Sequence, residues 1–151
     1  MTWAFDTDVL IYAAAPSHPL GSRVLQLFER GQDAVVGVGS LVLLTEMLTK
    51  PLRADPKSAE ALVLAGLLAQ LDLRPLDRPT ALIAVDLGVK YGLAAPDAIH
   101  LATAVYAGAT WFLTNNRRDF TKGIEEIDVV YPTDLPTAPL TPPHGARDSV
   151  R

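Results

Sequence analysis

Four acidic side chains stand where strands are expected to give way to helices or loops. Asp6 directly follows the apolar run WAF, and Glu46 interrupts the apolar stretch LVLLTEML. Asp97 follows Pro96 in the opening turn of an expected helix, and Asp119 lies in a short loop after WFLTNN. In open parallel sheets, ligands bind at the edge where the carboxyl ends of the strands meet. We therefore expect these four carboxylates to converge, although they lie far apart in the sequence.

Carboxylates that converge must either take up protons or bind cations. At an intermediate dielectric, like charges a few ångströms apart repel by several kcal/mol. Oxygen ligands favour hard cations, which here means Mg²⁺ or Mn²⁺. Such ions activate water and stabilise an in-line displacement at phosphorus. The sequence has no cysteine, which excludes disulfides, thiolate metal sites and a cysteine nucleophile.

Each acid also has an ordinary structural explanation. Asp97 in a first helical turn can simply balance the helix dipole, and Asp119 in a loop can face solvent. Glu46 and Asp6 are harder to explain in this way because both have apolar neighbours, and an unpaired buried charge is costly. His100, three residues after Asp97, is a further ligand candidate, but its helix face fits packing or a hydrogen bond to a ligand better.

The apolar pattern predicts where strands and helices lie. Short apolar runs rich in β-branched or aromatic residues predict strands at 2–5, 33–40, 73–77, 111–116 and 127–132. Apolar residues at helical spacing predict helices at 9–14, 20–31, 40–50, 57–71, 79–92 and 96–109. Thr7 or Asp8 is expected to cap the first helix. This regular alternation predicts an α/β fold, a parallel sheet with helices on both faces.

Length and composition indicate one domain. The chain has 151 residues, 49% of them hydrophobic, which suffices for a single core. We expect a folded domain at 1–131 and, because 132–151 is rich in proline, an extended or disordered tail. No apolar run is long enough to span a membrane and no basic flank precedes an apolar N-terminal stretch, so a soluble cytoplasmic protein is expected. The net charge of −4 argues against a duplex-DNA binder, but bound metal would reverse the charge of an acidic site, so nucleic acid stays open as a substrate.

Four segments together resemble the PIN-domain ribonucleases, and among these the VapC-type toxins of bacterial toxin–antitoxin pairs. In the family's order they read FDTDVLIY, SLVLLTEML, APDAIHLATA and FLTNNRRDF, and they cover the chain to about residue 131. The resemblance implies a three-layer α/β/α sandwich with a central, mostly parallel sheet and a divalent-metal site. It also implies metal-dependent endonucleolytic hydrolysis of RNA, leaving 5′-phosphate and 3′-hydroxyl ends.

The resemblance assigns a role to individual residues. Its catalytic and metal-binding acids would be Asp6, Glu46, Asp97 and Asp119, with Thr7 and Thr114 as supporting hydroxyls. Many relatives carry an aspartate directly after the "TN" of the last segment, where this chain has Asn116. An amide oxygen can still bind a metal but adds no negative charge. The fourth ligand therefore stays open between Asn116 and Asp119.

Partners follow from the same resemblance. Arg117, Arg118, Lys50 and Arg53 would contact RNA phosphates, although each also fits an ordinary solvated surface. A small antitoxin protein and a second copy of the chain, as a homodimer, are the expected protein partners. The apolar helices 41–48 and 59–71 would supply those faces.

Two other functions remain to be weighed. The sequence Asp6-Thr7-Asp8 also resembles the start of haloacid-dehalogenase-type phosphatases, in which the first aspartate is the nucleophile. That family has a small residue and a hydroxyl next, where this chain has Val9 and Leu10. The other alternative is a catalytically impaired PIN-fold protein that only binds a partner.

Overall fold

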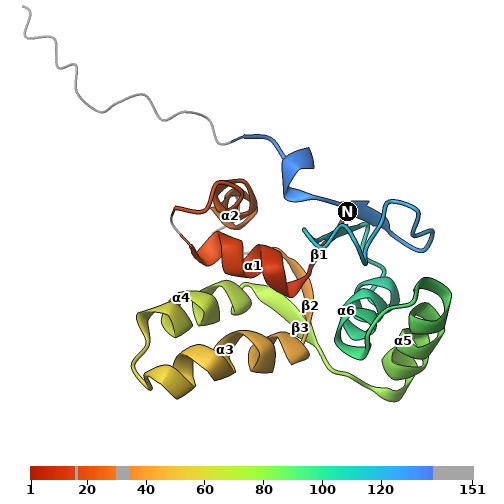
Figure 1. Cartoon of the computed structure of the whole chain (residues 1–151), viewed down its shortest axis with the longest axis horizontal. Helices are drawn as coiled ribbons and strands as arrows, with labels where there is room; N and C mark the ends of the chain where they lie inside the picture. The colour runs from red at the N-terminus through yellow and green to blue at the C-terminus, as the bar shows by residue number, and fades with distance from the viewer. Residues whose placement is uncertain (16, 30–34, 138–151) are drawn as a thin grey trace, which may run out of the picture.

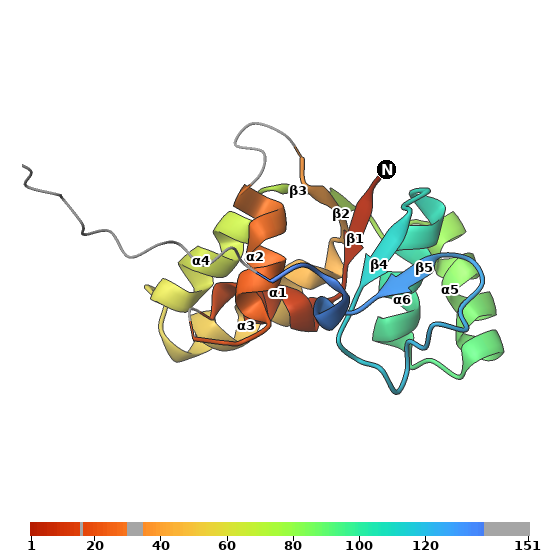
Figure 2. The same ribbon diagram turned by 90° about the horizontal axis from the view of Figure 1, so that it is seen from above.

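Five parallel strands form the centre of the molecule (Figures 1 and 2). The computed structural model describes residues 1–15, 17–29 and 35–137. The strands are β1 (Trp3–Phe5), β2 (Gly37–Ser40), β3 (Leu71–Arg74), β4 (Trp111–Leu113) and β5 (Asp128–Val130). Their order in the sheet is β3-β2-β1-β4-β5, so β1 is central and pairs with both β2 and β4. The predicted parallel α/β sheet is confirmed.

Six helices of the described residues cover the two faces of this sheet (Figures 1 and 2). They are α1 (Thr7–Ala14), α2 (Gly21–Glu29), α3 (Val42–Ala54), α4 (Ala59–Leu68), α5 (Arg78–Tyr91) and α6 (Ala95–Tyr106). Helices α1 to α4 lie on one face, and α5 and α6 lie on the other. The result is a three-layer sandwich. Among the residues described, no helix combines the length and apolar character needed to cross a membrane.

The central strand shows how two cores form from one short segment. Successive side chains of a strand point to opposite faces. Ala4 accordingly packs into the core under α5 and α6, and Phe5 packs into the core under α1 to α4. Because both faces are covered, the strands carry apolar residues on both sides.

Element boundaries differ from the prediction where caps and prolines decide them. Helix α1 begins at Thr7, and its cap is Asp6, whose side chain accepts the Thr7 N–H at 2.8 Å, rather than Thr7 or Asp8. The third strand is Leu71–Arg74 rather than 73–77 because Pro75 has no N–H to continue the ladder. The predicted helix 57–71 is correspondingly shorter, and Leu71 belongs to the strand.

The folded domain extends beyond residue 131. Residues 132–134 form a short 3-10 helix, and Leu135 is buried in the core beneath α1 to α4. Arg23 of α2 donates hydrogen bonds to the carbonyl oxygens of Thr133 and Leu135. The predicted start of the tail at 132 is therefore corrected to a later position, since the first residues of that segment bury apolar surface. The tail prediction for 138–151 lies outside the described residues.

Candidate active site

Asp6 lies at the carboxyl end of the central strand and is buried, with 5% of its surface exposed. Its backbone N–H donates to the carbonyl of Leu113, which extends the pairing with β4 by one residue. Its side-chain oxygens accept hydrogen bonds from Thr7 N–H at 2.8 Å and from Thr114 Oγ1 at 2.7 Å. Burial raises the pKa of Asp6, and these hydrogen bonds offset that rise only in part. Asp6 is thus a positioned carboxylate held in an environment that disfavours its charge.

Glu46 points from α3 toward the same place and shares its carboxylate with two partners. Thr7 Oγ1 donates to Glu46 Oε2 at 2.5 Å, and His100 Nε2 lies 2.9 Å from the same oxygen. The hydrogen bond from His100 lowers the pKa of Glu46. Glu46 therefore stays ionised and fixed in orientation.

His100 takes the hydrogen-bonding role that the helix face indicated. Burial disfavours the charged imidazole, but the bond to Glu46 and the negative charges of Asp6 and Asp97 raise the pKa of His100 overall. Its Nδ1 is buried without a hydrogen-bond partner among the described residues. The His100 side chain therefore holds Glu46 through its Nε2 atom.

Asp97 opens α6 and faces the other acids. No side chain or backbone group of the described residues donates a hydrogen bond to its carboxylate. Burial, followed by the negative charges of Asp6 and Asp119, raises the pKa of Asp97. Asp6, Glu46 and Asp119 each accept a side-chain hydrogen bond. The carboxylate of Asp97 is therefore the one whose oxygens remain available to water or a ligand.

Asp119 and Asn116 act as a pair in the loop after β4. Asn116 Nδ2 donates to Asp119 Oδ2 at 2.9 Å, and the Asp119 N–H donates back to Asn116 Oδ1 at 3.3 Å. This hydrogen bond, together with Arg118 Nε at 3.4 Å, lowers the pKa of Asp119. Asn116 therefore orients Asp119 and engages its own amide oxygen in doing so.

Asp8 is a residue of this cluster that the sequence reasoning did not assign to the site. Its Oδ2 accepts the backbone N–H of Asn115 at 3.0 Å, which ties α1 to the loop after β4. Burial, followed by the charge of Asp6, raises the pKa of Asp8 to about 6. Its position two residues after Asp6 could have indicated a place in the site. From the sequence alone, Asp8 was considered only as a possible cap of the first helix.

The acids of the cluster together carry more negative charge than their surroundings stabilise. Asp6, Asp8 and Asp97 all have raised pKa values. In the parts of the chain that the structure describes, no three His, Asp or Glu side chains stand close enough to hold an ion between them. Mg²⁺ is usually bound by one or two carboxylates, with water and substrate phosphate completing its shell. The donor set, all oxygen and net negative, fits an ion of that kind.

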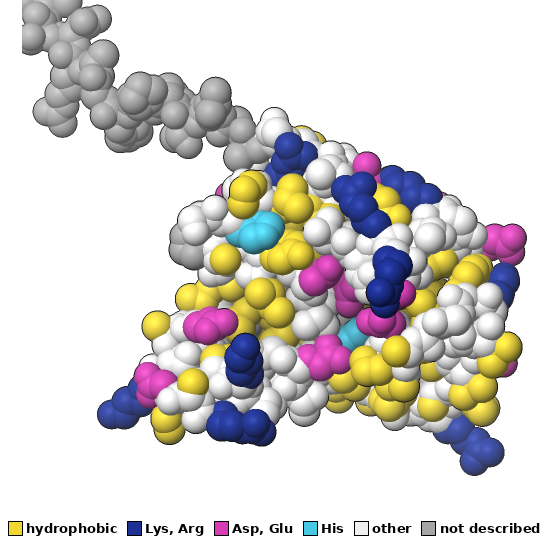
Figure 3. All heavy atoms as spheres, viewed as in Figure 1, with side chains coloured by type: hydrophobic (Ala, Val, Ile, Leu, Met, Phe, Trp, Pro, Cys, Tyr) yellow, Lys and Arg dark blue, Asp and Glu magenta, His cyan; other side chains and the backbone are white. Residues whose placement is uncertain are grey.

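The predicted RNA-binding cations fall into two groups around the acids. Figure 3 shows acidic side chains gathered in the middle of one face with basic side chains beside them. Lys50 and Arg53 follow Glu46 at i+4 and i+7, which places them on one side of α3. Arg118 is 91% exposed next to Asp119. Arg117 instead stacks on the Tyr131 ring, 4.4 Å from its centroid, and donates to Thr133.

Known structures share this architecture over nearly the whole chain. A toxin–antitoxin complex from Klebsiella pneumoniae has 24% identity and a TM-score of 0.67, covering 89% of this chain and 100% of that one. DNA-bound VapBC from Salmonella typhimurium has 16% identity and a TM-score of 0.70, with coverages of 87% and 98%. FitAcB from Neisseria gonorrhoeae has 20% identity and a TM-score of 0.66, with coverages of 89% and 100%. Comparison with curated proteins gives no match.

A family model decides the relationship. The model described as "PIN domain" matches residues 4–123, which includes the segments of Asp6, Glu46, Asp97 and Asp119. The match covers most of the chain and agrees with the sheet order and the layers of helices described above. This protein therefore belongs to the PIN domain family.

Proposed function

We propose that this protein is a divalent-metal-dependent endoribonuclease of the VapC type, the toxin of a toxin–antitoxin pair that acts in the cytoplasm. The observation that carries the proposal is the cluster of acids brought together from four segments. Burial raises the pKa values of Asp6 and Asp97, and the charges of Asp6 and Asp119 raise the pKa of Asp97 further. An excess of partly buried negative charge is stabilised by binding a cation, and a metal-dependent nuclease uses such a cation at its scissile phosphate.

The proposed ligands of Mg²⁺ or Mn²⁺ are drawn from Asp6, Glu46, Asp97 and Asp119. Because no three of the described acids stand close enough to hold an ion between them, one or two would bind it directly and the others through water. When bound, the ion would neutralise phosphate charge and acidify a water molecule. Asn116 is proposed to support the ion through Asp119, because its amide oxygen already accepts the Asp119 N–H. Thr7 and Thr114 hold Asp6, and Thr7 also holds Glu46, so both hydroxyls fix ligand orientation.

The protein's own groups suit hydrolysis of an RNA phosphodiester. Asp97 has no hydrogen-bond donor within the described residues and a raised pKa, so it is the carboxylate best suited to take a proton from the attacking water. Asp6, fixed on two sides, keeps its geometry during the reaction. Lys50, Arg53 and Arg118 would bind phosphates on either side of the scissile bond. Attack by water would leave a 5′-phosphate and a 3′-hydroxyl.

An antitoxin is the proposed protein partner. The structures named above include toxin–antitoxin and VapBC complexes. This chain has an apolar groove of about 330 Å³ between α3 and α4, lined by Leu48, Leu52, Ala61, Leu62 and Ala65 among others. Exposed apolar surface of this kind marks protein contacts. A small protein encoded beside this chain should co-purify with it and abolish cleavage.

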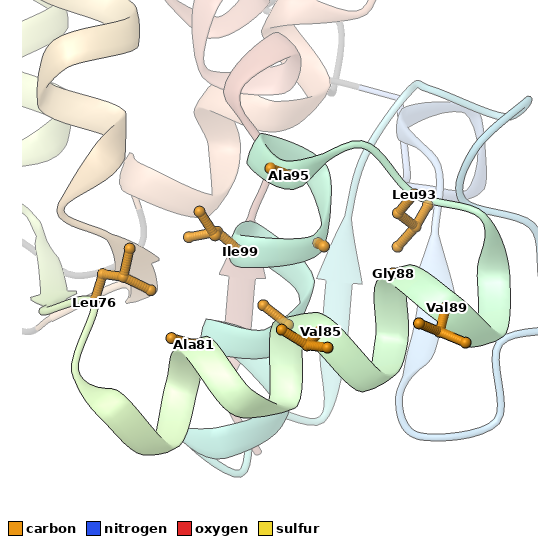
Figure 4. Close-up of a pocket in the computed structure, with 10 residues that line it drawn as sticks. Leu76, Ala81, Val85, Gly88, Val89, Leu93, Ala95 and Ile99 are labelled. Atoms are coloured by element: carbon orange, nitrogen blue, oxygen red, sulfur yellow. The ribbon is translucent and has the colours of Figure 1, made fainter.

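For the homodimer we propose the opposite side of the molecule, in place of the helices 41–48 and 59–71 expected from the sequence. An apolar groove of about 410 Å³ lies between α5 and α6 (Figure 4). Its rim includes Val85 and Val89, which are 61% and 82% exposed. A charge at this rim, as in Val89→Glu, should convert a dimer to a monomer in light scattering, and a monomeric unaltered chain would contradict the proposal.

The deciding experiment incubates the purified full chain, free of any antitoxin, with total RNA and Mg²⁺ or Mn²⁺. Cleavage should stop with EDTA and with Asp97→Asn, and fragment ends should carry 5′-phosphate and 3′-hydroxyl groups. Cleavage that persists in both controls would point to another enzyme or mechanism.

The impaired-binding alternative has its own test. The proposed nuclease should bind Mn²⁺, and Asp97→Asn should lose that binding. A catalytically impaired site should show no such loss, because it binds no Mn²⁺ through Asp97. The phosphatase alternative loses its support, because the family match assigns the segment of Asp6 to a PIN domain. A phosphorylated Asp6 after incubation with a phosphomonoester would revive it.

A further inference from the structure

An aromatic pair stands beside the acids and takes no part in the roles assigned so far. The rings of Tyr12 and His18 are stacked, with centroids 4.0 Å apart and planes inclined by only 7°. Tyr12 lies in α1, and His18 lies in the turn between α1 and α2. Both side chains are partly exposed rather than buried. The stacked pair therefore lies in part at the surface.

Tyr12 is connected to the acidic cluster in two ways. It follows Asp8 by four residues in α1, so the two side chains share a helix face about one turn apart. Its hydroxyl oxygen also accepts a hydrogen bond from Asn115 Nδ2 at 3.4 Å, while the Asn115 N–H binds Asp8. One helical turn rises about 5.4 Å, so Tyr12 lies within a nucleotide's reach of Asp8.

The backbone holds the His18 ring in its stacked position. Its Nδ1 accepts the N–H of Leu20 at 3.2 Å, and its carbonyl oxygen accepts the N–H of Gly21. These bonds tie the ring to the start of α2. The ring is thereby ordered before anything binds, which lowers the entropy cost of binding.

We infer that the Tyr12–His18 pair is a stacking platform for a base of single-stranded RNA next to the scissile phosphate. This inference rests on the proposed nuclease function and adds a substrate contact to it. Unpaired bases are recognised by stacking on aromatic side chains such as tyrosine and histidine, a contact that tolerates any base. The phosphates flanking that base would continue toward the exposed Arg118 beside Asp119.

Two substitutions at His18 separate the ring from its backbone role. His18→Asn keeps an acceptor for the Leu20 N–H but removes the aromatic face. His18→Phe keeps the face but removes the acceptor. If the ring stacks on a base, RNA affinity should fall in His18→Asn and persist in His18→Phe. If His18 has only a structural role, affinity should fall in His18→Phe and persist in His18→Asn. Circular dichroism of both variants checks that the helices remain folded.

The probe is a single-stranded RNA of about ten nucleotides with 2-aminopurine placed at each position in turn. The fluorescence of this base falls when it stacks. Stopped-flow mixing with the full chain and Mg²⁺ should show quenching at one position, together with cleavage beside it on a gel. His18→Asn should lose the quenching and raise KM about fivefold or more, with a smaller change in kcat, while His18→Phe should stay close to the unaltered chain. An abasic nucleotide at that position should remove the difference between the two variants.

The outcomes separate this inference from the nuclease proposal. Cleavage with quenching that is equal in both variants overturns the platform alone and leaves the ring pair as a packing or protein contact. Quenching that depends on the ring without cleavage supports the platform and contradicts the nuclease. An RNA that neither binds nor is cut overturns both. A DNA strand of the same sequence serves as the comparison for sugar preference.

Discussion

At the scale of single residues, the site is a set of carboxylates that differ in how firmly they are held. Asp6 and Glu46 accept hydrogen bonds that fix their orientation, whereas Asp97 has no such donor within the described residues. Burial nevertheless raises the pKa of both aspartates, which means that their charges cost folding free energy while no cation is bound. Function and stability therefore oppose one another at these positions.

Asp97→Asn should have opposite effects on stability and on metal binding. In EDTA the variant should unfold at a higher temperature than the unaltered chain, because it removes a carboxylate repelled by Asp6 and Asp119. Addition of Mn²⁺ should raise the melting temperature of the unaltered chain and leave the variant unchanged. Asp86→Asn, at an exposed position of α5, should alter neither value. Equal stabilisation of both chains by Mn²⁺ would contradict the assignment of Asp97 as a ligand.

The metal-free protein should become more stable as the pH falls from about 7.5 to about 5.5. The pKa of Asp8 is raised from 3.8 to about 6, so in this window the folded chain takes up a proton that the unfolded chain does not. The raised pKa values of Asp6, Asp97 and His100 act in the same direction. Thermal unfolding in EDTA at a series of pH values measures the slope.

Asp8→Asn should flatten part of that slope, because the amide cannot take up the proton. The lowered pKa of Glu46 does not interfere, since its contribution is lost only below the window. A melting temperature that falls steadily with acidification across the window would show that the charges of the cluster are already compensated.

At the scale of elements, short strands and their caps assemble the site. Asp6 directly follows β1 and caps α1, so the same side chain starts a helix and is a proposed metal ligand. Sequence reasoning predicted the acid but assigned the cap to its neighbours, because cap preference alone does not distinguish Asp6 from Thr7 or Asp8. The loop after β4 then supplies Thr114, whose hydroxyl reaches back to Asp6.

The segment after β5 should prove part of the domain rather than a tail. Leu135 is 7% exposed within the core beneath α1 to α4, so Leu135→Ala should cost about 2–3 kcal/mol of unfolding free energy. Chemical denaturation measures the change. Leu62→Ala, at a side chain that is 76% exposed, is the matched control and should stay within about 0.5 kcal/mol. An effect no larger than the control would restore the boundary at residue 131.

At the scale of the whole molecule, the net negative charge opposes binding of a polyanion such as RNA. The net charge is −4, so attraction of the proposed RNA substrate would depend on local cations rather than on the overall field. Lys50 and Arg53 lie on the side of α3 that carries Glu46. They are therefore the cations whose removal should be felt most directly.

The double variant Lys50→Gln with Arg53→Gln should bind RNA more weakly and with less salt dependence. For single-stranded nucleic acid, two lost phosphate contacts should reduce the slope of log affinity against log salt by about 1.4. Lys90→Gln is the control, because Lys90 is already paired with Glu125 and Glu126. A slope equal to that of the control would place the RNA elsewhere on the surface.

The sequence allowed the fold to be predicted, whereas the roles of the four predicted acids stay a prediction and the contacts among them could not be predicted. Alternating strands and helices imply a parallel sheet, and the ends of such strands imply where acids meet. The pairing of Asn116 with Asp119, the role of Asp8 and the stacking of Tyr12 on His18 depend on distances across the fold. No local pattern in the chain encodes those distances.

The bond between Thr114 and Asp6 joins residues that are 108 positions apart. During synthesis on the ribosome, the first aspartate emerges long before the hydroxyl that fixes it. A nascent chain therefore has no assembled centre until most of its length has been translated and released from the exit tunnel. The proposed ribonuclease would in this way be kept inactive while it is still attached to the ribosome and the message that produce it.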